Sequence, residues 1–245
     1  MAGKINEIWI GSEHELEEAL RSPRVTVQQC YAVHRADGYV KGMFQQHGIK
    51  ANIKVVDEKS MSSMSKQKNT HFWIQVTLSM DETIEEFMEN GVRPDLVLVL
   101  DQIQDPQNLG ALIRSAHFFG AKMVLMPKDH SSPLTDVVSR ASAGAVFSIP
   151  LVRATNLVRE INKLKEIGLY MISLSPESHD PLHTKDFKKD MVGLVIGSEG
   201  SGVRRLVEQT CDFQCSLTSK KGRDSLNASV AGGIALFEIS RQKNT

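Results

Sequence analysis

Hydrophobic runs and amphipathic stretches alternate along the chain, and their pattern changes near Pro94. Before that point the apolar runs are short and are separated by helical patterns. We expect strands at IWI, VTVQQCYAV, IKVV and FWIQVTL, and helices at HELEEALRS and GYVKGMFQQHG. This alternation predicts a small α/β sandwich within residues 1–80.

After Pro94 the apolar runs become continuous, and each of LVLVL, KMVLM, LYMISL and MVGLVIG precedes a helical pattern. Such runs are typical of parallel strands that are buried on both faces, with helices as the crossovers. Residues 96–245 are therefore predicted to form an open α/β sheet, whose ligands lie beyond the carboxyl ends of the strands. Residues 81–95 carry six acids and one Arg, which predicts a solvated linker helix.

The composition is that of an ordinary globular chain, with 41% hydrophobic and 24% charged residues among 245. Lys+Arg and Asp+Glu both number 29, so a nucleic-acid partner would need a local basic patch. No apolar run approaches the roughly 18 residues of a membrane span. The cysteines and histidines show neither a disulfide framework nor metal-ligand spacing. We expect a cytoplasmic protein with structural thiols, no membrane anchor and no metal.

The first candidate site directly follows LVLVL. Asp105-Pro106 predicts a turn, Asn108 is a candidate helix cap, and residues 109–119 have helical periodicity. Arg114 lies within this otherwise apolar helix, where an unpaired guanidinium would be costly to bury. Its expected anion is either a structural ion-pair partner or a bound phosphate.

The second candidate site is the loop in LVIGSEGSGVRRL. Gly197, Gly200 and Gly202 would let the backbone approach a ligand closely. The spacing matches neither the dinucleotide fingerprint nor the P-loop. Glu199 in this loop suits a ligand with hydroxyls or positive charge, and the alternative is an acid that stabilises a helix N-terminus.

The third candidate site lies in CSLTSKKGRDSLNASVAGG. Ser225 and Asn227 stand where a long helix begins, so they either cap that helix or take part in chemistry. The small residues from Ala228 to Gly233 allow close packing of another helix, within the subunit or between subunits. A local positive patch is supplied by Lys220, Lys221 and Arg223, and these charges are either simply solvated or bind nucleic-acid phosphates.

In their order and spacing, DPQNLGALIRS, IGSEGSG and DSLNASVA resemble the three motifs of the SpoU family of RNA ribose methyltransferases. The resemblance extends through RATNLVREI to the small amino-terminal domain and is strongest to guanosine 2′-O-methyltransferases of large-subunit (23S) ribosomal RNA, with transfer RNA enzymes next. It implies S-adenosylmethionine as cofactor, RNA as substrate and a homodimer. It also implies a deep trefoil knot in the carboxy-terminal parallel sheet and an L30e-like RNA-binding module at residues 1–80.

The resemblance also assigns roles by position. It implies that the reacting centre contains Asn108, Arg114, Glu199, Ser225 and Asn227. It implies that the cofactor is held by Leu174, Ser175, Ile196, Gly197, Gly200, Leu217 and Leu226. An Arg stays protonated near neutral pH, so we expect Arg114 to clamp a phosphate first.

Departures from the family pattern leave rival hypotheses open. Leu217-Thr218-Ser219 stands where relatives carry Ile-Pro-Met, and His71-Phe72-Trp73 replaces His-Gln-Gly. One rival is a catalytically silent RNA-binding relative, and another is an α/β enzyme that uses a nucleotide cofactor on a small molecule. Aromatic residues of the first domain would either stack on unpaired bases or fill the core: Trp9, Tyr31, Tyr39, Phe72 and Trp73.

Overall fold

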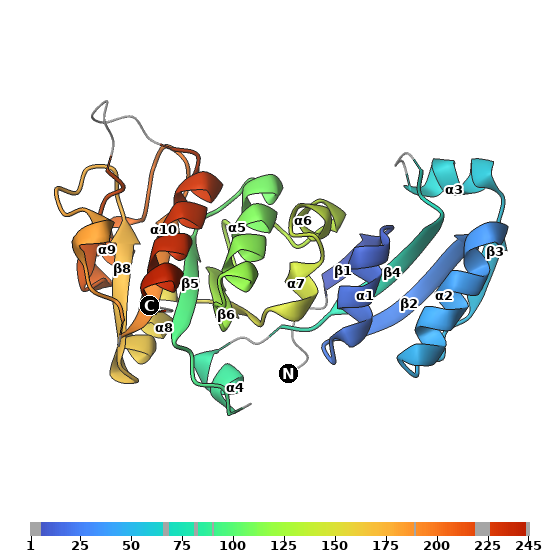
Figure 1. Ribbon diagram of the computed structural model, residues 1–245, viewed down its shortest axis with the longest axis horizontal. Coiled ribbons are helices and arrows are strands. Elements are labelled where there is room, and N and C mark those ends of the chain that lie inside the picture. Colours follow the sequence, from blue (N-terminus) through green and yellow to red (C-terminus); the bar gives the residue numbers. More distant parts are fainter. Residues whose placement is uncertain are drawn as a thin grey trace.

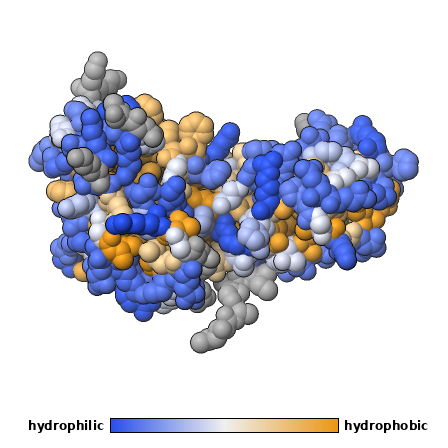
Figure 2. Space-filling model, turned by 60° about the horizontal axis from the view of Figure 1, so that its bottom comes forward, coloured by the Kyte–Doolittle hydropathy of each residue, from blue (hydrophilic) through white to orange (hydrophobic). Residues whose placement is uncertain are grey.

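Two β-sheets, formed by successive parts of the chain, lie side by side along the longest axis of the molecule (Figure 1). The computed structural model describes residues 6–65, 69–80, 83–89, 91–188, 190–218 and 226–243. We call residues 6–78 the amino-terminal unit and residues 96–243 the carboxy-terminal unit. Hydrophilic residues cover most of the side seen in Figure 2, and hydrophobic patches occur on both units. Within the described residues, no helix is long and apolar enough to cross a membrane.

The amino-terminal unit is a four-stranded sheet in the order β1-β4-β2-β3. Only the β2–β3 pair is parallel. Helices α1 and α2 lie on the same face of this sheet (Figure 1). The elements are β1 (Asn6–Ile10), α1 (Glu13–Arg21), β2 (Val25–Val33), α2 (His34–Gln46), β3 (Ile53–Val56), α3 (Glu58–Ser65) and β4 (Phe72–Leu78). The α/β sandwich predicted from the sequence is confirmed.

Three aromatic rings stack on this sheet. The ring centroids of Trp9 and Trp73 are 5.7 Å apart, and those of Trp9 and Tyr31 are 6.3 Å apart. Trp73 is buried beside Met61 of α3, whereas Trp9 and Tyr31 are half-buried. Lys54 places its Nζ 5.5 Å from the Tyr31 centroid. Trp73 therefore fills the core, which was one of the two alternatives predicted for these aromatic residues. Trp9 and Tyr31 keep exposed surface that a partner can contact.

The carboxy-terminal unit contains six parallel strands in the order β10-β8-β9-β5-β6-β7. Its strands are β5 (Leu96–Asp101), β6 (Met123–Pro127), β7 (Leu151–Ala154), β8 (Leu169–Leu174), β9 (Met191–Gly197) and β10 (Phe213–Cys215). Its helices are α5 (Pro106–Phe118), α6 (Asp136–Ala141), α7 (Ala145–Ser148), α8 (Leu157–Glu166), η1 (Leu182–Thr184), α9 (Arg205–Thr210) and α10 (Ala228–Lys243). The parallel α/β sheet is confirmed, and the knot stays a prediction.

Alternate residues of β5 pack into different clusters, which explains why this strand is a continuous apolar run. Leu96, Leu98 and Leu100 belong to the core that includes α5 and α10. Val97 and Val99 belong to the core that includes α8 and α9. Each face of the sheet is thus covered by helices, as parallel sheets require.

The linker prediction needs a correction. Helix α4 (Ile84–Met88) lies in this segment, and its Ile84 and Phe87 are buried rather than solvated. Both side chains join the core on the α8 face, and the backbone N–H of Ile84 donates to the Glu160 carboxylate at 3.1 Å. Two apolar residues three positions apart are enough to bury one face of a short acidic helix. The number of acidic residues alone therefore did not predict this burial.

The two units are joined by direct polar contacts as well as by the chain. Ser139 of α6 donates to the Glu15 carboxylate of α1 at 2.6 Å, and both residues are buried. Arg24 donates to the carbonyls of Phe147 and Ile149 at 3.0 and 2.8 Å. A continuous hydrophobic core also runs through both units. The amino-terminal unit is therefore docked on the carboxy-terminal unit through α6 and α7.

Candidate functional site

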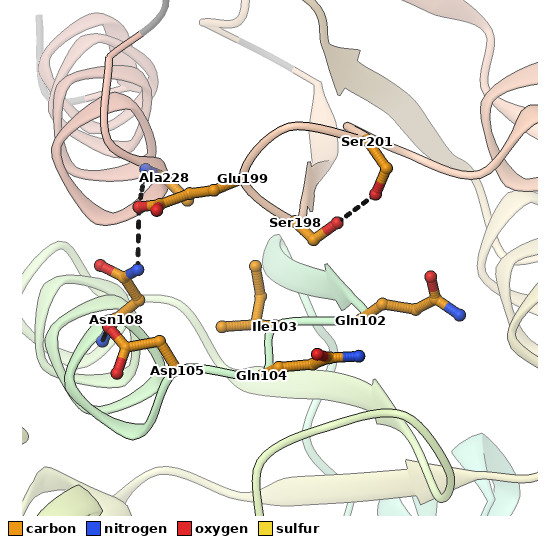
Figure 3. Close-up of a pocket in the computed structure, with 9 residues that line it drawn as sticks. All are labelled: Gln102, Ile103, Gln104, Asp105, Asn108, Ser198, Glu199, Ser201 and Ala228. Atoms are coloured by element: carbon orange, nitrogen blue, oxygen red, sulfur yellow. Dashed lines mark hydrogen bonds between the residues drawn. The ribbon is translucent and has the colours of Figure 1, made fainter.

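A pocket of about 270 Å³ opens at the carboxyl ends of β5 and β9 (Figure 3). These strands are neighbours, and Asp101 pairs with Gly197 in the last register position. The loops that follow the two strands therefore face each other, at the edge where parallel sheets bind ligands. Nine residues line the pocket: Gln102, Ile103, Gln104, Asp105, Asn108, Ser198, Glu199, Ser201 and Ala228.

One end of the pocket is a hydrogen-bonded cluster from three distant segments. Asn108 donates through Nδ2 to Glu199 Oε1 at 3.0 Å. Asn227 donates through Nδ2 to Asn108 Oδ1 at 2.9 Å and also to Glu199 Oε1. The backbone N–H of Ala228 lies 3.5 Å from the same carboxylate oxygen. This cluster, which we call the amide–carboxylate cluster, unites the three sequence motifs.

Local capping explains how α5 presents Asn108. The N-cap is Asp105, whose carboxylate accepts the N–H groups of Gln107 and Asn108, and Pro106 occupies the first turn. The prediction that Asn108 caps the helix is therefore wrong. Asn108 instead lies inside the first turn, and its buried side chain is free to join the cluster.

Asn227 caps α10, as one of the two alternatives predicted, and it also belongs to the hydrogen-bonded cluster; its part in the chemistry stays a prediction. Its Oδ1 accepts the backbone N–H groups of Ser229 at 2.9 Å and Val230 at 3.3 Å. Its Nδ2 is left to donate to Asn108 and Glu199. Glu199 in turn lies at the N-terminus of α10, where the helix dipole favours a negative charge.

An ion pair between a buried aspartate and an exposed arginine fixes the two pocket walls to each other, and the sequence reading missed it. Asp101, which is fully buried at the end of β5, accepts from the backbone N–H and Nε of Arg204, each at 2.8 Å. The NH2 of Arg204 lies 2.7 Å from the same carboxylate. The available signal was an aspartate at the end of a continuous apolar strand, where an unpaired charge is costly.

Gly197 is required for a reason different from the one expected. A Cβ built on Gly197 would lie 2.0 Å from the carbonyl carbon of Gly202, whose N–H and carbonyl pair with Ser198. The glycine thus lets the loop fold back on itself, and close approach of a ligand is not what demands it. Gly200 has a φ of 86° with open space around it, so its backbone conformation is what favours glycine there.

Gln102, in the loop that follows β5, adopts an unusual backbone conformation. This loop forms the lower wall of the pocket in Figure 3. The φ of Gln102 is 61°, a left-handed value that costs a non-glycine residue about 1 kcal/mol. Gln102 is half-buried and Gln104 is exposed. Neither residue stood out in the sequence, because glutamines in a polar loop give no pattern.

The residues expected to hold the cofactor lie outside this pocket. They cluster at the carboxyl ends of β10, β8 and β9, which are adjacent strands. The Ser175 N–H donates to the Cys215 carbonyl at 2.9 Å, and Leu174 and Leu217 pack half-buried against one core. Leu226 is 51% exposed. Ile196 and Gly197 end β9 between this apolar edge and the amide–carboxylate cluster.

Comparisons with known proteins give a consistent answer. Residues 95–237 match the model of the SpoU rRNA Methylase family. A 23S rRNA (guanosine-2′-O-)-methyltransferase of Pseudomonas putida is 37% identical over 98% of this chain and 90% of its own length. The corresponding Coxiella burnetii protein is 41% identical over 91% of this chain and 90% of its own length.

The chain belongs to the SpoU rRNA methylase family. Among solved structures, the SpoU methyltransferase AviRb from Streptomyces viridochromogenes superposes with a TM-score of 0.83 at 20% identity and covers 98% of this chain and 90% of its own. An AdoMet-bound rRNA methyltransferase from Sinorhizobium meliloti gives 0.80 at 22% identity, with 96% and 87% covered. At these identities the two structures support the fold, which includes the amino-terminal unit.

Arg114 of this SpoU family member is exposed, contrary to the expectation that it is buried. Among the described residues no carboxylate lies within ion-pair distance of it, so none of them is the partner that the structural ion-pair alternative requires. Arg114 does not line the pocket of its own subunit. Phe118 follows four residues later on the same helix face and is 78% exposed.

The small residues of α10 pack inside the subunit. A Cβ on Gly232 would lie 2.3 Å from Leu112 of α5, and Ala228 and Ala235 are buried. These small residues therefore allow α10 to pack closely on α5 within the subunit, which was one of the two alternatives predicted. The exposed side of α10 carries large apolar residues instead: Val230, Ile234 and Phe237.

The remaining predictions concern four residues outside the described part of the chain, the three cysteines and metal binding. Ser225, Lys220, Lys221 and Arg223 lie outside the described residues. The three cysteines are free, and burial raises the pKa of Cys30 and of Cys211 to about 12, as expected for structural thiols. No cluster of three potential metal ligands occurs among the described residues.

Proposed function

We propose that this chain transfers a methyl group from S-adenosylmethionine to the ribose 2′-hydroxyl of a guanosine in 23S rRNA. The observation that carries the proposal is the amide–carboxylate cluster, because it joins all three family motifs at the ligand edge of the sheet. The Pseudomonas putida relative, similar over nearly its full length, supports the choice of RNA and nucleotide. Action on ribosomal RNA also supports a cytoplasmic location.

The residues at the ends of β10, β8 and β9 fit the proposed cofactor. Leu174, Leu217 and Leu226 offer partly exposed apolar surface for an adenine ring, and Ile196 and Gly197 border it. Ser175 and Gly200 lie in the two loops that complete this edge. The Glu199 carboxylate would favour a sulfonium charge nearby. When bound, S-adenosylmethionine supplies the methyl group.

The pocket would hold the acceptor ribose. Asn108 and Asn227 fix Glu199 Oε1, and among the described residues no group donates to Oε2. Oε2 is thus the oxygen that would accept a hydrogen bond from the 2′-hydroxyl and orient it for in-line attack. Ser225 would assist at the start of α10. As the bond from the 2′-oxygen to the methyl group forms and the sulfur–methyl bond breaks, the hydroxyl proton would pass to Glu199 Oε2 and from there to water.

A second copy of this chain would complete the site. The exposed face formed by Phe118 of α5 and by Val230, Ile234 and Phe237 of α10 is apolar enough for a homodimer contact. Arg114 shares the helix face of Phe118, so dimerisation through this face would carry it toward the partner's pocket. There its guanidinium would clamp the phosphate beside the target ribose.

RNA would also contact surfaces away from the pocket. Lys220, Lys221 and Arg223 would bind phosphates, so RNA affinity should fall as salt rises. We propose that residues 1–80 recognise the RNA, that residues 81–95 link them to the methyltransferase domain at residues 96–245, and that the amino-terminal domain is L30e-like. Trp9 and Tyr31 have accessible ring surface for unpaired bases.

The test combines cofactor binding with methyl transfer. Wild-type protein is titrated calorimetrically with S-adenosylmethionine and with S-adenosylhomocysteine, and then incubated with unmodified 23S rRNA and tRNA transcripts. One cofactor per subunit and a ribose methyl mapped to a guanosine of 23S rRNA are expected. Methylation of tRNA alone would favour a transfer RNA enzyme. Binding of RNA without cofactor binding or transfer would favour the silent relative.

A further inference from the structure

The pocket has a polar end that the methyl-transfer chemistry does not use. In Figure 3 the amide–carboxylate cluster lies on one side, and the side chains of Gln102 and Gln104 extend on the other. Gln102 and Gln104 belong to the lower wall, and Ser198 and Ser201 belong to the upper wall. The Ser198 and Ser201 hydroxyls hydrogen-bond to each other at 2.5 Å.

The two carboxamides are available to a ligand. Within the described residues, no side chain or backbone group hydrogen-bonds to the side chain of Gln102 or of Gln104. Polar groups in a pocket normally have partners, and a carboxamide offers both a carbonyl acceptor and N–H donors. The pair can therefore bind a group that presents donors and an acceptor together.

The walls that carry these glutamines are held in place before any ligand binds. Asp101 precedes Gln102 and is tied to Arg204 of the opposite wall by three contacts of 2.7 to 2.8 Å. Ile103, between the glutamines, is buried, and its carbonyl accepts the N–H of Ser132 at 2.8 Å. Such fixed walls can discriminate between ligands, because little ordering is left to occur on binding.

The backbone at Gln102 points to a use for its side chain. A left-handed φ of 61° is easiest for Gly or Asn, and yet this chain carries Gln. Strain that persists in a binding pocket is an indication of function. The pocket of about 270 Å³ is also small for a ligand site, so it suits one nucleoside rather than a nucleoside and a cofactor together.

We propose that Gln102 and Gln104 read the base of the nucleotide whose ribose is methylated. The inference rests on the proposed function, because it assumes that the ribose lies at the amide–carboxylate cluster. The Watson–Crick edge of a guanine that has turned out of its helix presents N1–H and N2–H donors and the O6 acceptor. The two carboxamides can pair with all three, whereas inosine, which lacks the N2 amino group, would leave a carbonyl unpaired.

The experiment removes the glutamine side chains by substitution and removes the guanine N2 amino group by replacing guanosine with inosine. The position methylated by the wild type is first mapped on a 23S rRNA transcript. Two RNA oligonucleotides spanning that position are then made, with guanosine or inosine at the target. The initial rate at limiting RNA gives kcat/KM for the wild type, Gln102→Gly, Gln104→Ala and the control Gln107→Ala. Gln102→Gly also relieves the strained φ, so misfolding is not expected to mask its effect.

The wild type should prefer guanosine by about 10-fold or more in kcat/KM, because one unpaired polar group costs at least that much. Gln102→Gly and Gln104→Ala should reduce the preference toward unity with unchanged cofactor affinity. Gln107→Ala, exposed and outside the pocket, should retain it. A preference that survives in both pocket variants, or equal rates for both RNAs in the wild type, would overturn the inference alone. No methylation of either RNA by the wild type would overturn the proposed function together with the inference.

Discussion

Asn227 shows how one side chain can cap a helix and hold a neighbouring carboxylate through different atoms. Its carbonyl oxygen caps α10, and its amide nitrogen holds the Glu199 carboxylate. A sequence can indicate only that an Asn stands at a helix start. Its second role depends on Asn108 and Glu199, which are 119 and 28 residues away in the chain.

The two roles of Asn227 can be separated by substitution. Asn227→Ala should lower the free energy of unfolding by about 1 kcal/mol, because the cap is lost. Asn227→Ser should retain the cap and remain within about 0.5 kcal/mol of wild type. Both should lose methyl transfer by at least about 10-fold, since both lack the Asn227 amide that donates to Glu199 and to Asn108. Urea unfolding and methyl incorporation measure the two effects, and full activity in Asn227→Ser would contradict the assignment.

At the scale of elements, strands that are long and apolar were predictable to the residue. The runs at β2, β4, β8 and β9 coincide with the observed bounds. Strand β7 was missed, because its Arg153 interrupts the apolar run and yet is buried, where it donates to the Lys128 carbonyl at 3.0 Å. Tertiary contacts of this kind leave no period in the sequence, and the same holds for the buried helix α4.

The crossing of α5 and α10 supplies a matched pair of glycine substitutions. Gly232→Ala should destabilise the protein by about 1 to 3 kcal/mol, because the new methyl would overlap the side chain of Leu112. Gly233→Ala should stabilise it by up to about 1 kcal/mol, since its Cβ would meet its nearest atom, Ser115 Oγ, at an ordinary 3.6 Å. Thermal and urea unfolding give both values. Equal effects of the two substitutions would show that the helices do not cross as described.

The stacked aromatic rings provide a direct optical test of RNA binding. Both tryptophans of the chain, Trp9 and Trp73, belong to this stack. If unpaired bases stack on it, unstructured single-stranded RNA should quench tryptophan emission and a duplex of equal length should not. Trp9→Phe should keep most of the RNA affinity, whereas Trp9→Ala should lose about 1 kcal/mol or more. Tyr39→Ala, on α2, serves as the control, and unchanged emission at saturating RNA would exclude this surface.

At the scale of the whole molecule, the proposed site depends on two subunits. Light scattering should report a dimer, and Phe237→Glu should shift it toward monomer, because a charge would be buried in the apolar contact. A persistent monomer in the active wild type would contradict the proposal.

Mixed subunits test directly whether Arg114 acts across the dimer. Arg114→Ala and Asn108→Ala should each abolish methyl transfer as homodimers, with Arg114→Ala retaining cofactor affinity. When the two variants are unfolded and refolded together, mixed dimers contain one site with both residues intact, so a sizeable part of the activity should return. Failure to recover activity in mixed dimers of confirmed composition would place Arg114 in its own subunit's chemistry.

The contact of α1 with α6 and α7 limits how the amino-terminal unit can be exchanged for that of a relative. Glu15 is buried at that contact, and its carboxylate accepts a hydrogen bond from Ser139. An amino-terminal unit transplanted from a relative with a cut in the linker would leave Ser139 and the carbonyls that Arg24 contacts facing foreign side chains. Evolutionary or engineered exchange of the amino-terminal unit therefore has to carry matching changes in α6 and α7. If this unit recognises the RNA, as we propose, retargeting the protein to another RNA requires two compatible surfaces rather than one portable module.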